Sequence, residues 1–110
     1  MDHYYHAKDL AHFSDIGKEA PELWEKFSAW YNAVIKDGAL SEREKAQIAL
    51  AVAHAVQCPY CIDAYTTASL EKGSTPEQMT EAVHVAAAIR GGASLVHGVQ
   101  MRNQLDKLSM

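Results

Sequence analysis

The chain has 110 residues, a formal net charge of −4 and 22% charged residues, and this length predicts a single domain over residues 1–110. The acidic balance argues against nucleic acid and anionic membranes as partners, since both attract basic surfaces. The sequence has neither an apolar run of membrane-spanning length nor the apolar stretch of a signal peptide, so we expect a cytoplasmic protein.

The N-terminal third predicts an arm followed by helices. Residues 1–20 are expected to form this arm and a short helix. Apolar residues then recur at spacings of four, three and four, which is one face of an amphipathic helix: Leu23, Phe27, Trp30 and Val34. Pro21 suits the first turn of this helix, and Gly38 suits the position just beyond its end.

The second long helix is predicted to begin at a capping box and to end at a proline. Ser41 caps it while Glu44 reaches back to the Ser41 backbone. We expect a break at Gln57–Cys58, because Pro59 cannot continue a helix interior but suits the first turn of a new helix.

The remaining elements are also helical. A helix is predicted from about Pro59 to Lys72, with Gly73 as its left-handed cap. Thr75 then caps the next helix, and Gly91–Gly92 is expected to weaken or kink it. A separate last helix is predicted to carry Leu95, Val99, Met101, Leu105 and Leu108.

This pattern predicts an all-α fold with more apolar helix surface than one chain can bury. Residues 46–56 and 81–89 are apolar nearly all round, so such helices need cover on most sides. Because large exposed apolar patches are rare on soluble monomers, we expect other copies of the chain to supply part of that cover. A compact monomer with one central helix is the alternative.

The only two cysteines of the chain, Cys58 and Cys61, stand in the sequence CPYC at a predicted helix start. On a helix they share one face, and the N-terminal dipole favours a thiolate at Cys58. A thiolate is the nucleophilic form, and a sulfenic acid on one sulfur can be resolved by the other. The spacing therefore indicates a dithiol redox site that requires no cofactor.

Two other interpretations of the cysteines remain open. A structural zinc site needs four ligands, whereas one CxxC supplies two; His54, His84 or His97 would have to complete it. Alternatively, both cysteines are ordinary core residues.

Two neighbours are candidates for assisting the cysteines. His54 lies four residues before Cys58, although the predicted break interrupts their common face. Tyr65 lies four residues after Cys61, so its hydroxyl is expected along the cysteine face. There it would donate a hydrogen bond to a thiolate or a bound peroxide, or else serve as a core tyrosine.

The stretch "IALAVAHAVQCPYCIDAYT", followed by "AAAIRGG", resembles the carboxymuconolactone decarboxylase superfamily in its alkylhydroperoxidase D (AhpD)-like branch. The resemblance covers about residues 20 to 100. It implies an all-α fold with the cysteine pair at a helix start, assembled into homo-trimers or homo-hexamers. The branch is similar to peroxidases in which a glutamate twelve residues before the first cysteine and a histidine four after the second relay protons. Here those positions hold Ala46 and Tyr65.

We therefore expect a dithiol peroxidase or thiol–disulfide oxidoreductase that uses Cys58 and Cys61, with Tyr65 and His54 as further candidate catalytic residues. Its partners would be a hydroperoxide substrate and a thiol electron donor. No cofactor and no metal is expected. Because both relay groups are missing, the alternative is a non-catalytic or weakly active oligomeric binding protein of the same fold.

Overall fold

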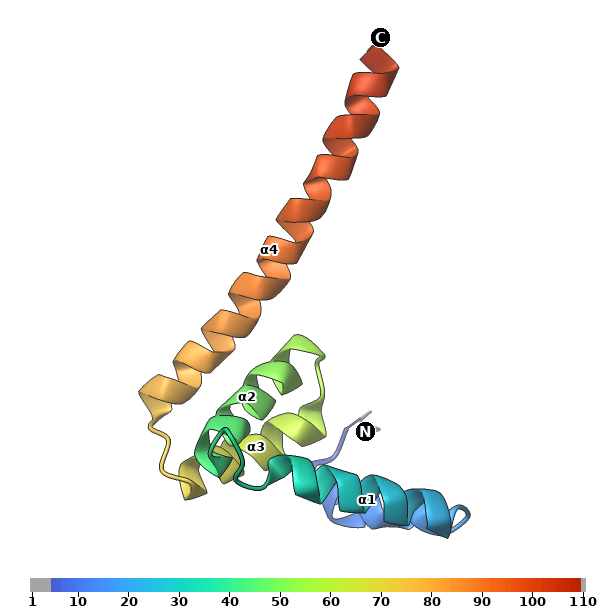
Figure 1. Cartoon of the computed structure of the whole chain (residues 1–110), viewed down its shortest axis with the longest axis vertical. Helices are drawn as coiled ribbons and strands as arrows, with labels where there is room; N and C mark the ends of the chain where they lie inside the picture. Colours follow the sequence, from blue (N-terminus) through green and yellow to red (C-terminus); the bar gives the residue numbers. More distant parts are fainter. Residues whose placement is uncertain (1–4, 110) are drawn as a thin grey trace.

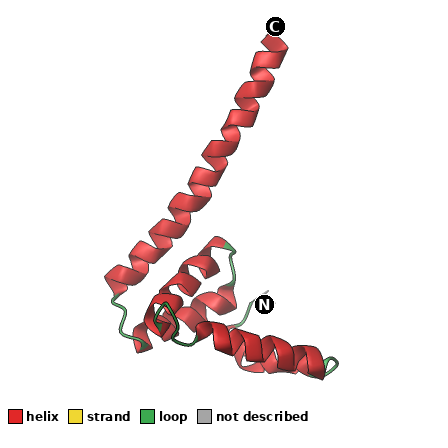
Figure 2. Ribbon diagram, in the orientation of Figure 1, coloured by secondary structure: helices red, strands yellow, loops and turns green. Residues whose placement is uncertain are grey.

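The computed structural model describes residues 5–109, and the described part of the chain consists of helices joined by short connections (Figures 1 and 2). In chain order these are the 3₁₀ helix η1 (Ala7–Gly17), α1 (Pro21–Ile35), α2 (Glu42–Ala55), α3 (Pro59–Glu71) and α4 (Pro76–Ser109). No strand occurs among the described residues, which confirms the all-α prediction. The predicted short N-terminal helix is η1; residues 1–4 of the predicted arm lie outside the described residues.

The predicted caps at the starts of α2 and α4 are confirmed by their hydrogen bonds. At α2, the Glu44 amide donates to Ser41 Oγ at 3.1 Å, and the Ser41 amide donates to Glu44 Oε1 at 2.9 Å. This capping box lowers the pKa of the Glu44 carboxyl, chiefly through the backbone hydrogen bond from Ser41. At α4, Thr75 and Gln78 exchange the same two bonds at 3.1 and 2.9 Å.

The predicted break between α2 and α3 is also confirmed. α2 ends at Ala55, and the chain turns through Gln57, whose φ of 58° is the only positive value at a described non-glycine residue. α3 then begins at Pro59 and is followed by Gly73 with φ of 93°, the left-handed residue that the sequence predicts there. A non-glycine residue at positive φ is uncommon and persists where the surrounding structure holds it.

α2 is the central element because it contacts α3 on one side and α4 on another. Its side chains Ala46, Leu50 and Ala53 form most of the buried apolar core, together with Ala86 of α4. Arg90 of α4 donates a hydrogen bond from Nη1 to the carbonyl oxygen of Ala55, the last residue of α2. This bond satisfies one of the carbonyls that a helix C-terminus leaves without an internal partner.

η1 folds back along α1 and also contacts α3. The close approach depends on Gly17, where an added Cβ would lie 2.6 Å from Cγ of Trp24. Phe13 packs edge-on against Trp24, with ring centroids 5.0 Å apart. The N-terminal segment is thereby held beside the start of α3.

One sequence prediction is wrong: α4 neither kinks at Gly91–Gly92 nor gives way to a separate last helix. It is a single helix of 34 residues (Figure 1). A glycine inside a helix costs only about 1 kcal/mol relative to alanine, which the neighbouring helix-forming residues outweigh. The two glycines therefore weaken the helix without ending it.

The C-terminal half of α4 stands away from the other helices (Figure 1). The chain measures 59 × 38 × 37 Å and its radius of gyration is 18.9 Å, compared with roughly 13 Å for a compact domain of this size. Large apolar side chains are exposed along this half of α4: Leu95, Val96, Val99, Met101, Leu105 and Leu108. Among the described residues, no helix has the combination of length and hydropathy that a membrane span requires.

The capping box yields a stability prediction. Ser41→Ala removes the acceptor for the Glu44 amide and should lower the free energy of unfolding by about 1 kcal/mol. The measurement is urea unfolding at a fixed protein concentration, with Ser94→Ala as a control because Ser94 lies within α4 and caps nothing. An equal loss of unfolding free energy in both variants would show that the Ser41 cap does not contribute to stability.

Candidate functional site

Cys58 and Cys61 are joined by a disulfide at the start of α3, and their Cα atoms lie 5.2 Å apart. Cys58 is the N-cap residue of α3, with Pro59 in the first turn. The Cys61 amide donates a hydrogen bond to Cys58 Sγ at 3.2 Å. Both cysteines are half-buried.

This position favours charge on Cys58 when the pair is reduced. The first amides of a helix have no internal acceptors, and the helix dipole stabilises a negative group there. The Cys61 N–H already points at Cys58 Sγ, so it would stabilise a thiolate at that atom. Cys61 lies one turn inside the helix, where this stabilisation is weaker.

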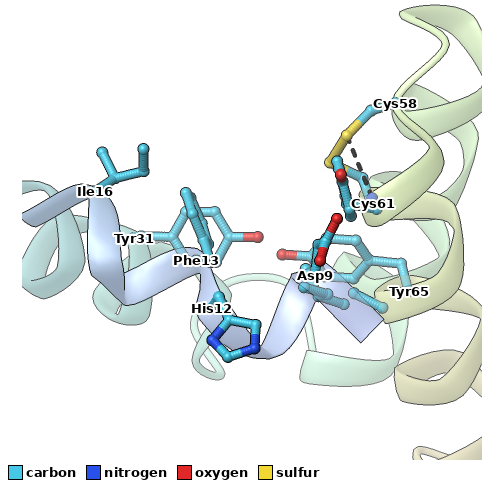
Figure 3. A pocket seen from close by; sticks show the side chains of 11 residues that line it. Asp9, His12, Phe13, Ile16, Tyr31, Cys58, Cys61 and Tyr65 are labelled. Carbon is cyan, nitrogen blue, oxygen red and sulfur yellow. Dashed lines mark hydrogen bonds between the residues drawn. A yellow bond between two sulfur atoms is a disulfide. The ribbon is translucent and has the colours of Figure 1, made fainter. Parts of the chain in front are cut away.

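The disulfide opens into a cavity of about 640 Å³ between η1, α1 and α3 (Figure 3). Most of its wall is aromatic or aliphatic, and its lining includes Leu10, Phe13, Ile16, Tyr31, Cys58, Cys61 and Tyr65. A volume of this size accommodates a small organic molecule. The cysteines are thus placed where an apolar ligand would meet them.

A second cavity of about 650 Å³ lies against α2, lined by Ile48, Val52 and Val56 among others. Tyr31, Cys61 and Tyr65 line both cavities. We call these three residues the Tyr31–Cys61–Tyr65 wall, since they stand between the two spaces. In Figure 3 the hydroxyl ends of Tyr31 and Tyr65 point toward one another across the cavity.

Tyr65 lines the same cavity as Cys61, as its spacing from that cysteine predicts. The sequence does not predict that Tyr31 lines this cavity as well. Tyr31 is on α1, and burial raises the pKa of its hydroxyl above the usual value. No spacing rule connects it to the cysteines, because contact across helices depends on how η1 and α1 pack against α3. The helical stripe of α1 was the only available signal, and Tyr31 is adjacent to that stripe.

The structure does not bring His54 to this cavity. Its Nδ1 lies 2.8 Å from the carbonyl oxygen of Leu50 on α2, and His54 does not line either cavity. Ala46, at the position of the family glutamate, is buried in the core with 3% of its surface exposed. A methyl group cannot transfer a proton, so neither α2 position offers proton relay at the sulfurs.

Two titratable residues of η1 line the cavity instead, Asp9 and His12. The His12 ring is turned away from the sulfurs in Figure 3, and its Nδ1 lies 3.6 Å from the Asp15 carboxylate. Close by, Tyr5 donates a hydrogen bond to Asp63 of α3, which raises the pKa of Tyr5 to about 12. These contacts link the N-terminal segment to the helix that carries the cysteines.

No group of three or more His, Cys, Asp or Glu side chains able to hold a metal ion occurs within residues 5–109. The cysteine pair is instead bonded to itself.

The sequence pattern of the carboxymuconolactone decarboxylase family matches residues 21–101. The chain belongs to this family. It is similar to a Paracoccus denitrificans protein described as uncharacterized protein 4 in the cox locus, with 37% identity over 92% of this chain and 91% of the relative. A Cupriavidus necator protein, also described as uncharacterized, is 26% identical over 88% of this chain and 86% of its own.

Two solved structures share the fold. A protein from Methanobacterium thermoautotrophicum superposes with a TM-score of 0.73 and 37% identity, over 76% of this chain and 94% of that chain. An apo carboxymuconolactone decarboxylase family protein from Legionella pneumophila gives a TM-score of 0.70 and 36% identity, over 84% of each chain. The family assignment from sequence is confirmed, and the AhpD-like branch agrees with it. The family match begins after η1, so the N-terminal wall of the cavity lies outside the matched region.

The N-cap position predicts unequal thiols in the reduced protein. Cys58 should titrate below the ordinary thiol pKa of about 8.5, and Cys61 should titrate closer to that value. The measurement is the rate of iodoacetamide alkylation against pH for Cys58→Ser and Cys61→Ser, which each retain one thiol. A lower pKa for Cys61 than for Cys58 would contradict the assignment.

Proposed function

We propose that this carboxymuconolactone decarboxylase family protein is a dithiol peroxidase, or thiol–disulfide oxidoreductase, that reduces hydroperoxides through Cys58 and Cys61. The observation that supports this most is the disulfide at the N-terminus of α3, open to an apolar cavity. In a reducing cytoplasm a disulfide is more often catalytic than structural.

The reaction begins with attack by the Cys58 thiolate, the form that the Cys61 N–H stabilises. Its sulfur bonds to the terminal oxygen of the hydroperoxide, the O–O bond breaks, and the second oxygen departs as an alkoxide. The alkoxide takes up a proton in place of the one that Cys58 lost to solvent on ionising, and it leaves as the alcohol. Cys58 is then a sulfenic acid. The Cys61 thiol loses its proton and attacks Cys58 Sγ, the S–O bond breaks, and the hydroxyl leaves as water.

This second step forms the Cys58–Cys61 disulfide that the structure contains. An external thiol donor returns two electrons by thiol–disulfide exchange and restores both thiols. The chain's own residues thus supply the nucleophile, the resolving thiol and the apolar binding surface. No organic or metal cofactor enters the cycle.

A second candidate is a non-catalytic or weakly active oligomeric binding protein. Ala46 is buried and Tyr65 replaces the family histidine, so the proton relay of peroxidases in the branch is missing at both positions. A cavity of about 640 Å³ would still bind an apolar ligand without turnover.

We further propose that the protein works as a homo-trimer or homo-hexamer. Leu95 of α4 is 81% exposed and Leu108 is 73% exposed, within an apolar row on a helix half that stands away from the other described helices (Figure 1). Such a surface is rarely left open on a soluble monomer. Other copies of the chain provide matching apolar surface, because every copy has the same unburied faces on α1, α2 and α4.

Peroxidase chemistry predicts a fixed thiol stoichiometry. Hydroperoxide added to the reduced protein should remove two thiols per chain, and a dithiol reductant should restore both. Cys61→Ser should stop at a Cys58 sulfenic acid that dimedone labels, whereas Cys58→Ser should lose most of its reactivity. If the free thiols persist at peroxide concentrations far above cellular levels, the peroxidase proposal is contradicted and the binding-protein candidate is favoured.

The assembly predicts a solution mass three or six times that of the 12.1 kDa chain. Light scattering coupled to size exclusion measures it directly. Leu95→Asp combined with Val99→Asp should dissociate the assembly, since unpaired carboxylates are costly to bury between subunits. A parent protein that is monomeric at micromolar concentration would overturn the proposed oligomer.

A further inference from the structure

The Tyr31–Cys61–Tyr65 wall carries chemistry beyond the thiols. It places two phenol groups from different helices, α1 and α3, in the same wall as Cys61, at the junction of two apolar cavities. Their hydroxyl ends converge in Figure 3. A polar point within an apolar wall fixes the orientation of an amphipathic ligand, because the polar end of the ligand binds at that point and its apolar end binds the surrounding wall.

An organic hydroperoxide is such a ligand. Its apolar group matches the surface formed by Leu10, Phe13 and Ile16, and its two oxygens match the sulfurs and hydroxyls. When a thiolate attacks the terminal oxygen, negative charge develops on the second oxygen, which departs as an alkoxide. An alkoxide is a strong base, so a donor at that oxygen lowers the barrier.

We propose that the Tyr31 hydroxyl is this donor. It donates a hydrogen bond to the leaving oxygen of an organic hydroperoxide and gives that oxygen a proton as the O–O bond breaks. The Tyr65 hydroxyl, on α3, faces the Tyr31 hydroxyl across the cavity (Figure 3). The sulfur–oxygen bond forms at the cysteine and the alcohol leaves. The Tyr31 phenolate then takes a proton from solvent, which received the proton that Cys58 lost when it ionised. This inference rests on the proposed peroxidase function.

The surroundings favour Tyr31 over the other groups at the cavity. The Tyr31 hydroxyl keeps its proton at neutral pH and is able to donate it, because a phenol ordinarily titrates at about pH 10; burial raises its pKa further. A carboxylate such as that of Asp9 accepts hydrogen bonds but does not donate them. The His12 ring is turned away and pairs with Asp15.

A proton donor to the leaving oxygen changes the dependence of the rate on the peroxide used, which a purely structural residue does not. Its contribution grows with the basicity of the leaving group. tert-Butyl hydroperoxide releases the strongly basic tert-butoxide, whereas peracetic acid releases acetate, which needs no proton. Comparing the two peroxides on the same variant therefore isolates the proton donated by Tyr31.

The experiment measures second-order rates of thiol loss at neutral pH for the reduced parent, Tyr31→Phe and Asn32→Ala. Tyr31→Phe should slow the reaction with tert-butyl hydroperoxide by about 10²-fold and slow peracetic acid far less. Asn32→Ala is the control, because Asn32 follows Tyr31 on α1 and lines neither cavity. Iodoacetamide alkylation should be equal in all three, since it breaks no O–O bond.

The outcomes separate this inference from the function on which it rests. A parent that loses no thiols to either peroxide overturns the proposed peroxidase and the donor role together. If the parent reacts with the peroxides and Tyr31→Phe reacts at the same rates, the donor role alone is overturned. Equal slowing of both peroxides, or slower alkylation, would mean that Tyr31 acts on packing or on the thiolate and is not the donor.

Discussion

The hydrogen bond from the Cys61 amide to Cys58 Sγ is the interaction on which the candidate site depends. It exists because α2 stops at Ala55 and α3 starts afresh at Pro59. The Arg90 guanidinium binds the Ala55 carbonyl, and Gln57 adopts a left-handed conformation that turns the chain. A continuous helix would use the Cys61 amide within its own ladder, and Cys58 would lose the stabilisation of its thiolate.

The rest of the molecule arranges an apolar space around that helix start. η1 and α1 provide its far wall, held together by Phe13 and Trp24 and by the absence of a side chain at Gly17. The cost of this open arrangement is a small core around Leu50 and a long helix that leaves the packed unit. Association with other copies would bury the apolar faces that one chain leaves exposed.

The helices and their ends were predictable because capping and helix-breaking residues act locally. Ser41, Thr75, Pro59 and Gly73 each determine a boundary through their own backbone or side chain. The continuity of α4 was not predictable from Gly91–Gly92, since a glycine that a helix tolerates and a glycine that kinks it look alike in sequence.

The pairing of the two cysteines was predictable from their spacing, but the residues around them were not. Tyr31 and the η1 residues come to the cavity of the cysteines only through tertiary packing. His54 instead contacts the carbonyl oxygen of Leu50, one turn earlier on the same helix.

The proposed function requires Cys58–Cys61 to be a working redox couple with a stabilised thiolate. A stabilised reduced form makes a disulfide easier to reduce, as in catalytic dithiols with potentials of about −120 to −270 mV, whereas structural disulfides lie below about −300 mV. Equilibration of the protein in glutathione and dithiothreitol redox buffers, which together cover both ranges, with free thiols quantified by mass, measures the potential directly. We predict a reversible two-electron transition within the catalytic range. A disulfide that stays oxidised below about −300 mV would contradict the account, because it would be a structural cross-link.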